Sequence, residues 1–565
     1  MEAPNIFIFM DAVRISVAVF TIFVVSRFFK FYNSLKRTHS LPGRRPPFQP
    51  FGLPGALLPT TSWNLGPDMH WINRKSMYSQ HAQVVSIVPW LIGPSSIWSN
   101  NLDVARQVTA GGHKSDWIKP EEASQALLVW GMNLVASEGQ VWRRHRRVVG
   151  PAFNSKLYKF VWEEAVKTYK DMIVTEGWAH NNNNNIPCAQ DLTFKYALLL
   201  IGKCGFGFNF TWADPPQSSS SAPGSQSRMP VQEAIRIVAD SNLLFALAPK
   251  WCRNLPLESI RHASRAHDEL DAFMHEQVAQ RRAVYQGQHS HGSTDTADTP
   301  NDIFSLLIAA NEAEAESKYR LSEEELIGNV FVMLFAGHET TAHTLAAALG
   351  FLAVYEEIQE EVYEEVKDVL PGDSNSDPEY EECYSKLIKT AACFFEAVRM
   401  SAAGHVLVRQ STCDTVLNIP VSGSGSGSRE STESGSGSNE MKPIPIPKGV
   451  NVVIDMVGVQ YNPRYFPDPY TYKPSRWYEM GNNDSEAFSG FSIGPRACVG
   501  RRFAITEAVC FIACLLRDYR VEPLLGVKSD GTKETRTEWR ERVLDGKIVL
   551  TLGVKDVPLR FVPRV

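Results

Sequence analysis

The amino-acid sequence predicts a mostly α-helical protein with small β-sheets, organised as a single large domain behind an N-terminal transmembrane helix. Three observations support this fold class. An apolar run opens the chain of 565 residues. Most of the remaining sequence shows the apolar spacing of helices, and strand-like segments such as residues 449–459 are short and few. The composition, 44% hydrophobic and 21% charged, is that of an ordinary globular protein.

The opening segment, Ile6 to Phe29, is long enough to cross a bilayer, which takes about 20 residues. Asp11 and Arg14 interrupt it, but both lie in its N-terminal half, nearer one membrane interface. We predict a membrane anchor at residues 1–32, with a cleaved signal sequence and an amphipathic surface helix as the alternatives. A basic flank predicts that the rest of the chain faces the cytoplasm: Arg27, Lys30, Lys36, Arg37, Arg44 and Arg45.

Composition divides the remainder of the chain. Residues 33–60 are rich in proline and glycine and predict a semi-rigid hinge rather than a helix. Residues 61–565 form the large domain, with polar low-complexity inserts near 181–185, 214–228, 286–301 and 422–440. We expect these inserts to be surface loops, because they cannot bury enough apolar area to offset the entropy of ordering them.

Charge and cysteine usage argue against two classes of protein. The net charge of −5 is unlike that of nucleic-acid-binding domains, which are usually basic. The nine cysteines show no CxxC or CxxH pairing, so neither a zinc site nor a disulfide framework is indicated.

The longest predicted helix covers residues 322–365, starts at Ser322 and breaks once near residues 353–357. In its middle stands AGHETT, residues 336–341, where Gly337 alone costs about 1 kcal/mol relative to alanine. One interpretation is a kinked core helix whose threonines bond back to carbonyls one turn earlier. The other is a helix opened for a small molecule and a proton relay.

Three further patterns could carry chemistry. Glu396 and Arg399 share one helix face between apolar flanks, where a buried ion pair needs further partners. Trp142 and Arg146 lie one turn apart, beside a run of arginines that could equally be a solvated basic face. In FSIGPRACVG, residues 491–500, Cys498 lies between a Gly-Pro turn and a helix start, where backbone N–H groups would stabilise a thiolate. A lone cysteine is otherwise a buried hydrophobe.

These motifs resemble those of the cytochrome P-450 family. FSIGPRACVG has the five fixed positions of the family's cysteine loop: Phe491, Gly494, Arg496, Cys498 and Gly500. AGHETT resembles the oxygen-activation helix, Glu396-x-x-Arg399 the E-x-x-R pair, and Trp142-x-x-x-Arg146 the W-x-x-x-R helix. YKPSRW, residues 472–477, is similar to the P-E-R-F/W segment and adds Arg476. The motifs occur in the family's order over essentially the whole chain.

The resemblance implies haem b, with Cys498 as the thiolate ligand of the iron. Partners of the haem propionates would be Arg496, Arg146, Trp142 and Arg409, although residues 400–409 lack the prolines that the family often has there. Phe491 would shield the sulfur, and Gly494 and Gly500 would allow close approach. Gly337 would leave room for dioxygen, while Thr340 and Glu339 would deliver protons. Glu396, Arg399 and Arg476 would form a structural cluster.

The family further implies a monooxygenase, anchored in the endoplasmic reticulum, that oxidises a lipophilic small molecule with O2. An NADPH-dependent reductase would supply electrons and dock on a basic face made of Arg143, Arg144, Arg147, Arg501 and Arg502. The polar inserts resemble those of fungal enzymes of specialised metabolism, for example of terpenoids. The alternatives are a haem-thiolate isomerase or dehydratase without a reductase, a haem sensor or carrier, and an anchored scaffold without a cofactor.

Overall fold

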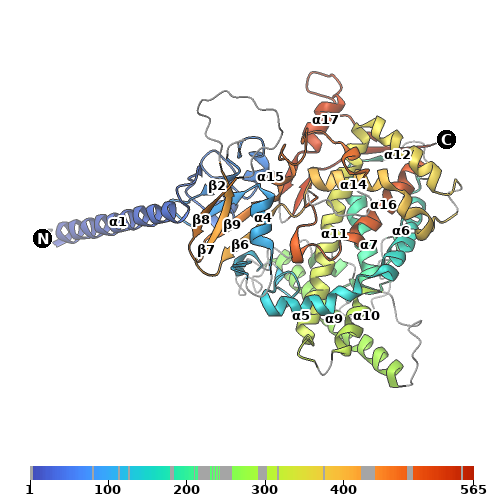
Figure 1. Cartoon of the computed structure of the whole chain (residues 1–565), viewed down its shortest axis with the longest axis horizontal. Helices are drawn as coiled ribbons and strands as arrows, with labels where there is room; N and C mark the ends of the chain where they lie inside the picture. Colours follow the sequence, from blue (N-terminus) through green and yellow to red (C-terminus); the bar gives the residue numbers. More distant parts are fainter. Residues whose placement is uncertain are drawn as a thin grey trace. The chain divides into compact units, whose positions relative to one another are not determined.

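The structure is a computed structural model (Figure 1). It describes residues 4–78, 82–111, 115–124, 127–178, 184–208, 210–213, 229–231, 233–235, 237–238, 241, 257–290, 302–314, 317–372, 376–421, 440–479, 488–548 and 551–564. Helices dominate and the sheets are small, so the predicted fold class is confirmed. The chain divides into two compact units, one of residues 1–119, 405–469 and 493–495, the other of residues 120–404, 470–492 and 496–565.

The first unit contains the N-terminal helix α1, Pro4–Arg37, and most of the β-structure. Within α1, Val13–Arg37 is long and apolar enough to cross a membrane by length and composition. The main sheet has the strand order β1 (Gly43–Arg44), β2 (Val84–Ile87), β3 (Ser96–Ser99), β9 (Asn451–Asp455), β6 (Val406–Ser411) and β4 (Trp117–Ile118). The remaining elements are the hairpin β7 (Thr415–Pro420) with β8 (Met441–Ile446), and α2 (Leu53–Leu57), α3 (Met69–Ile72), α4 (Leu102–Thr109) and α15 (Met456–Gln460).

Two segments of this unit contain structure that the sequence did not indicate. In the predicted semi-rigid hinge, residues 33–60, Gly43 pairs with Ser86 in the sheet and Pro54 lies in the first turn of the short helix α2. The Asn64 amide holds this segment by donating hydrogen bonds to the carbonyls of Gly55 and Leu58. The strand-like run 449–459 is a strand only as far as Asp455, whose carboxylate caps α15 by accepting the N–H of Gly458.

The second unit is mainly helical. Its helices are α5 (Gly139–Val149), α6 (Ser155–Thr175), α7 (Ala189–Leu200), α9 (Glu258–Ser290), α10 (Ile303–Ala313), α11 (Glu323–Val354), α12 (Glu356–Val369), α13 (Tyr380–Cys383), α14 (Ile388–Met400), α16 (Arg501–Asp518) and α17 (Arg536–Val543). Its strands are β5 (Asn184–Ile186), β10 (Tyr519–Pro523) and β13 (Leu559–Pro563) in one sheet, and β11 (Gly546–Ile548) with β12 (Leu552–Val554) in a hairpin.

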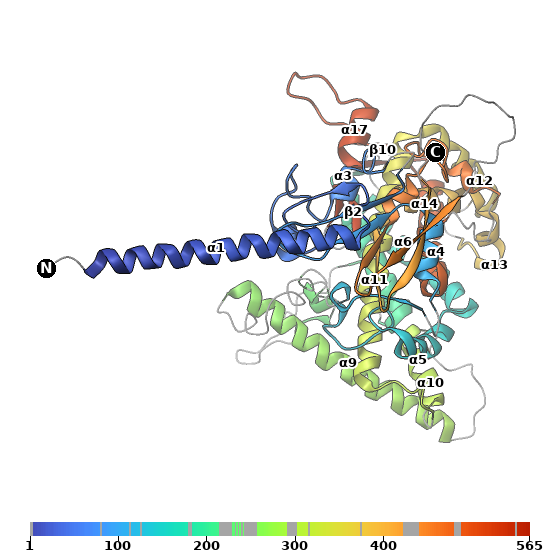
Figure 2. The ribbon, with the colours of Figure 1, turned by 60° about the vertical axis from the view of Figure 1, so that its left-hand side comes forward.

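Helix α11 forms the centre of this unit and packs against α7, α14 and α16 (Figures 1 and 2). Its start is a capping box, in which Ser322 and Glu325 satisfy each other's backbone N–H groups. It ends at Tyr355, after which α12 begins, so the predicted start and break of the long helix are both confirmed. Most of its side chains are buried, as its apolar sequence requires.

The insert predictions concern mostly residues outside the described ranges, including all of 214–228 and residues 422–439. Two described parts differ from a loop. Asn184 and Asn185 belong to β5, where they pair with Phe561 and Arg560, because the edge of β13 satisfies their backbone. Residues 286–290 continue α9.

Candidate functional site

The cysteine loop is held by its own backbone. The N–H of Cys498 donates to the carbonyl of Phe491 at 2.9 Å, which closes the loop before α16 begins at Arg501. Gly494 adopts a φ of +74°, and a Cβ there would lie 2.9 Å from the carbonyl oxygen of Thr109. Only glycine meets both conditions without strain.

The Cys498 side chain keeps an accessible surface although it lies deep among protein atoms. Burial raises the pKa of the thiol. Two features oppose this effect and favour the thiolate: hydrogen bonds from the backbone N–H groups of Gly500 and Arg501, and the guanidinium groups of Arg146 and Arg501. Burial outweighs these two features, so the pKa of the thiol stays raised, and the same donors and guanidinium groups would stabilise the thiolate once a cation binds the sulfur.

The thiol of Cys498 and the guanidinium groups near it fit haem. Among the described residues, no group of three or more His, Cys, Asp or Glu side chains could hold a bare metal ion. Cys498 can supply one ligand only, which fits an iron whose other ligands come mainly from a prosthetic ring. The guanidinium groups gathered around the sulfur are suited to carboxylates on such a ring.

Arg496 is oriented by three contacts from the start of α5. Its guanidinium lies 4.8 Å from the Trp142 ring centroid and donates to the carbonyl of Ser137 at 2.7 Å. It also forms a 2.8 Å ion pair with Glu138, a residue that the sequence motifs did not single out. Burial lowers the pKa of Arg496 and Glu138 opposes that effect. Trp142, Arg146 and Arg496 thus lie in the same unit as Cys498. The Glu138 carboxylate partly neutralises the charge of Arg496.

In the AGHETT segment, each selected residue has a specific neighbour. A Cβ on Gly337 would lie 3.1 Å from Cδ1 of Ile201, which belongs to a π-helical turn, Ile201–Gly205, after α7. Because Gly337 has no side chain, Ile201 can pack closely against the helix at this position. The Thr340 hydroxyl donates to the carbonyl of Ala336 at 2.8 Å, the back-bonding that a plain core helix would show. Glu339 instead faces the C-terminal hairpin, where Thr551 donates to its carboxylate at 2.7 Å.

Glu396 and Arg399 are fully buried and form a bidentate pair with distances of 2.8 and 2.9 Å. Arg476 joins them, with its Nε 3.3 Å from Glu396. Two further donors complete the carboxylate: the indole N–H of Trp477 at 2.9 Å and the backbone N–H of Lys473 at 3.0 Å. The charge of Glu396 is therefore satisfied from two segments, α14 and residues 473–477, so its burial is tolerable.

The arginines of the predicted basic face have different surroundings. Arg144 pairs with Glu325, and Arg147 donates to Glu314 at 2.7 Å, so neighbouring acids neutralise both charges. Arg501 lies over the rings of Phe488 and Phe491, at 5.3 and 5.7 Å from their centroids. Arg502 is exposed and lies over the Tyr158 ring at 5.2 Å. Arg143 is half-buried on α5.

Arg409 lies on β6 in the first unit. It is 7% exposed and donates to the carbonyl of Val408 at 2.8 Å. Gly494 also belongs to that unit. Cys498 belongs to the second unit, so a role for Arg409 beside the haem stays a prediction.

Sequence reasoning missed Glu507, which is 1% exposed on α16 opposite Thr341 of α11. Burial raises the pKa of this carboxyl well above its ordinary value, and the Thr341 hydroxyl opposes that effect. A single acid in the apolar stretch 503–516 was a signal that could have identified it. Thr551 and Glu138 carried no comparable signal. Their partners, Glu339 and Arg496, are far away in the sequence, and no sequence pattern links them.

Comparisons with known proteins all point to one family. The family model described as "Cytochrome P450" matches residues 74–419 and 436–538. Cytochrome P450 monooxygenase 124 of Postia placenta is 32% identical over 444 residues, which cover 78% of either chain. A phomenoic acid biosynthesis cluster cytochrome P450 monooxygenase of Leptosphaeria maculans is 26% identical over 75% of this chain and 74% of its own. Human cytochrome P450 4F2 is 27% identical over 70% and 69% of the two chains. The chain belongs to the cytochrome P450 family.

Proposed function

We propose that this protein is a membrane-anchored haem-thiolate monooxygenase of fungal specialised metabolism that oxidises a lipophilic small molecule. The observation that carries this proposal is the accessible Cys498 thiol, flanked by guanidinium groups and backbone N–H donors. As a member of its family, the chain is a cytochrome P450 monooxygenase that uses haem with a cysteine thiolate ligand. When bound, haem supplies the reductive activation of O2.

Within this proposal, residues from several elements hold the haem. Cys498 would ligate the iron, Arg146, Arg496 and Trp142 would bind the propionates, and Phe491 would limit the access of water to the sulfur. The cluster of Glu396, Arg399 and Arg476 fixes the segment that precedes the cysteine loop. Its full burial and its bonds to two segments support this positioning role.

Thr340 and Glu339 are the proposed proton-delivering residues. Thr340 is half-exposed, so its hydroxyl can leave the carbonyl of Ala336 to orient a water molecule or substrate. The hydroxyl of Thr551 orients the Glu339 carboxylate. An isomerase or dehydratase would not need Thr340 and Glu339 to deliver protons. The oriented carboxylate of Glu339 therefore favours the monooxygenase over that alternative.

The anchor proposal assigns α1 to the endoplasmic reticulum membrane, with the rest of the chain in the cytoplasm. The candidate span Val13–Arg37 and the basic residues at its C-terminal end support this topology. A variant starting after residue 37 should be recovered in the soluble fraction with an unchanged absorption spectrum. Continued pelleting with membranes would contradict α1 as the sole anchor.

The metabolic context rests on relatives. The name of the Leptosphaeria maculans relative assigns that protein to a biosynthesis cluster, which supports specialised metabolism here. Terpenoids are the substrate class that we propose. Deleting the gene in its host and profiling metabolites tests this class: a lost terpenoid would support it, and a lost compound of another class would reject it.

The proposed redox partner is an NADPH-dependent reductase with an acidic docking face. Of the basic residues, Arg143 and Arg502 should contribute more than Arg144 and Arg147, because the charges of Arg144 and Arg147 are neutralised by Glu325 and Glu314. Arg502→Glu should raise the reductase KM, whereas Arg147→Gln should change it little.

The decisive experiment is a carbon monoxide difference spectrum of the purified, reduced protein, followed by NADPH consumption with the reductase. A thiolate-type Soret band that Cys498→Ser abolishes is expected. A colourless protein would leave the scaffold alternative. A coloured protein that consumes no NADPH in the presence of reductase and candidate substrates would favour the sensor or the carrier.

A further inference from the structure

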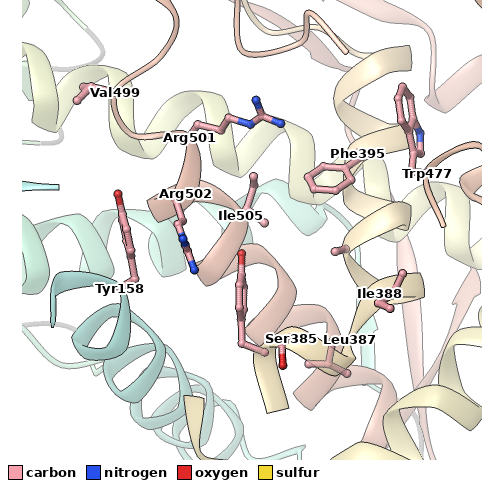
Figure 3. Close-up of a pocket in the computed structure, with 12 residues that line it drawn as sticks. Tyr158, Ser385, Leu387, Ile388, Phe395, Trp477, Val499, Arg501, Arg502 and Ile505 are labelled. Atoms are coloured by element: carbon pink, nitrogen blue, oxygen red, sulfur yellow. The ribbon is translucent and has the colours of Figure 1, made fainter. Parts of the chain in front are cut away.

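A cavity lies beside the cysteine loop, on elements of the helical unit (Figure 3). Its volume is about 460 Å³, within the range of roughly 300–1,000 Å³ that small-molecule sites occupy. Val499 and Arg501 line this cavity, whereas the neighbouring residue Cys498 does not. The cavity is therefore distinct from the site proposed for haem, although the same loop borders both.

The lining contains a guanidinium, that of Arg502, whose described contacts are with neutral groups. Arg501 and Arg502 both line the cavity, and the lining residues that the structure describes include no Asp or Glu. Aromatic groups orient Arg502: its guanidinium lies 5.2 Å from the Tyr158 ring and 5.9 Å from the Tyr384 ring. It also donates to the hydroxyl of Tyr380 at 3.4 Å. These neutral contacts hold the guanidinium in place and leave its charge available to an anion.

The opposite wall is apolar. Phe395 and Trp477 are 7% and 4% exposed, and Ile388 is 43% exposed at the start of α14. Figure 3 shows Phe395, Trp477 and Ile388 on one side of the cavity and Tyr158 with Arg502 on the other. The indole N–H of Trp477 is already bonded to Glu396, so this wall offers ring and alkyl surface rather than free donors. A ligand that matches both walls has an anionic group and an apolar body.

We infer that this cavity binds a small amphipathic anion, a carboxylate or sulfonate on an aromatic or alkyl body. The anionic group lies at Arg502, and the body packs on Phe395 and Ile388. Arginine recognises carboxylates through paired N–H donors, and an aromatic wall accepts a flat body at little entropic cost. Because the occupied cavity covers Arg501 and Arg502, the bound anion competes with the reductase. This last consequence rests on the proposed function, whereas the binding itself does not.

The test uses 2-naphthoate as the probe and 2-naphthamide as its neutral isostere, both titrated calorimetrically into the oxidised full-length protein. Saturating imidazole, a ligand of haem iron, keeps the probe from the haem site. We expect 2-naphthoate to bind and 2-naphthamide to bind at least tenfold more weakly. Arg502→Gln should weaken 2-naphthoate binding tenfold or more, and Arg502→Lys by less. Arg520→Gln is the matched control, because Arg520 is 46% exposed on β10 and does not line the cavity.

Two results would overturn the inference: equal affinity for the acid and the amide, or an affinity for the acid that Arg502→Gln leaves unchanged. Ile388→Glu gives a second, independent check, since a carboxylate at this exposed wall position should repel 2-naphthoate. If 2-naphthoate fails to bind while Arg502→Gln weakens reductase binding, the cavity seats a group of the partner protein and the small-molecule site is wrong. If 2-naphthoate binds as expected yet does not raise the reductase KM, the binding site stands and the proposed docking face is wrong.

Discussion

The hydroxyl of Thr551 donates a 2.7 Å hydrogen bond to the carboxylate of Glu339, across 212 residues of sequence. This bond joins the hairpin of β11 and β12 to the segment of α11 that carries Gly337, Glu339 and Thr340. A carboxylate that accepts such a bond is restricted in direction, which matters if it passes protons to a neighbour. Thr551 is therefore a positioning residue for Glu339 in the proposed function.

Replacing Thr551 tests this relationship. Thr551→Val removes the donor and keeps the shape, so Glu339 should lose its orientation and a larger fraction of electrons should end in peroxide. Thr551→Ser keeps the hydroxyl and should restore coupling. The measurement is peroxide formed per NADPH consumed, across a pH series. The apo protein gives a second readout, since a double-mutant cycle of Thr551→Val with Glu339→Gln should show a coupling energy of about 1 kcal/mol. Wild-type coupling in Thr551→Val would contradict the role.

Thr340→Ala separates haem binding from proton delivery. The variant should keep the thiolate spectrum, because the Thr340 hydroxyl bonds to the carbonyl of Ala336 within its own helix and not to the cysteine loop. It should lose product in favour of peroxide, because the hydroxyl that orients water is gone. Thr344→Ala is the control, since this hydroxyl bonds back to the carbonyl of Thr340 in the same way, one turn further along α11. Full coupling in Thr340→Ala would refute the relay.

Glu396→Ala should destabilise the fold strongly. The substitution leaves Arg399 buried, with a guanidinium that is 0% exposed, and removes the acceptor of Arg476 and Trp477. Removing one partner of a buried pair costs about 3–5 kcal/mol. Glu364→Ala, which breaks an exposed pair with Lys367, should cost less than about 1 kcal/mol. Urea unfolding of the two variants and the wild type compares them. Equal losses would show that Glu396 is not a structural centre.

Glu507 predicts a pH dependence of stability. Its folded pKa is raised well above the ordinary value because the carboxyl is buried. Between the ordinary and the raised pKa, the folded state binds more protons than the unfolded state, so stability should fall as pH rises through this window. Glu507→Gln removes the titration and should gain stability relative to the wild type as the pH rises above the ordinary pKa of a glutamate. Free energies of unfolding across that window measure the effect, and parallel curves would contradict it.

The features that the sequence predicted well depend on neighbours along the chain. The start of α11 at Ser322 was predictable because the capping box needs only residues three apart. Its break at Tyr355 followed from the change from an apolar to a highly acidic stretch. The Pro-rich segment was predicted as a hinge, since composition alone does not reveal that Gly43 finds a strand partner in Ser86. The pairing of Asn184 with Phe561 was hidden for the same reason.

By itself, the sequence determined which residues can do chemistry: a thiol before a helix start, an acid beside a threonine in α11, and a Glu-Arg pair one turn apart. The tertiary structure determined which groups form hydrogen bonds and ion pairs with these residues and so orient them. It assigned Glu138 to Arg496, residues 473–477 to Glu396 and Thr551 to Glu339, and it neutralised Arg144 and Arg147. The physical reason is that a buried or oriented charge needs donors within about 3 Å, and packing brings them from segments whose sequence gives no sign of the meeting.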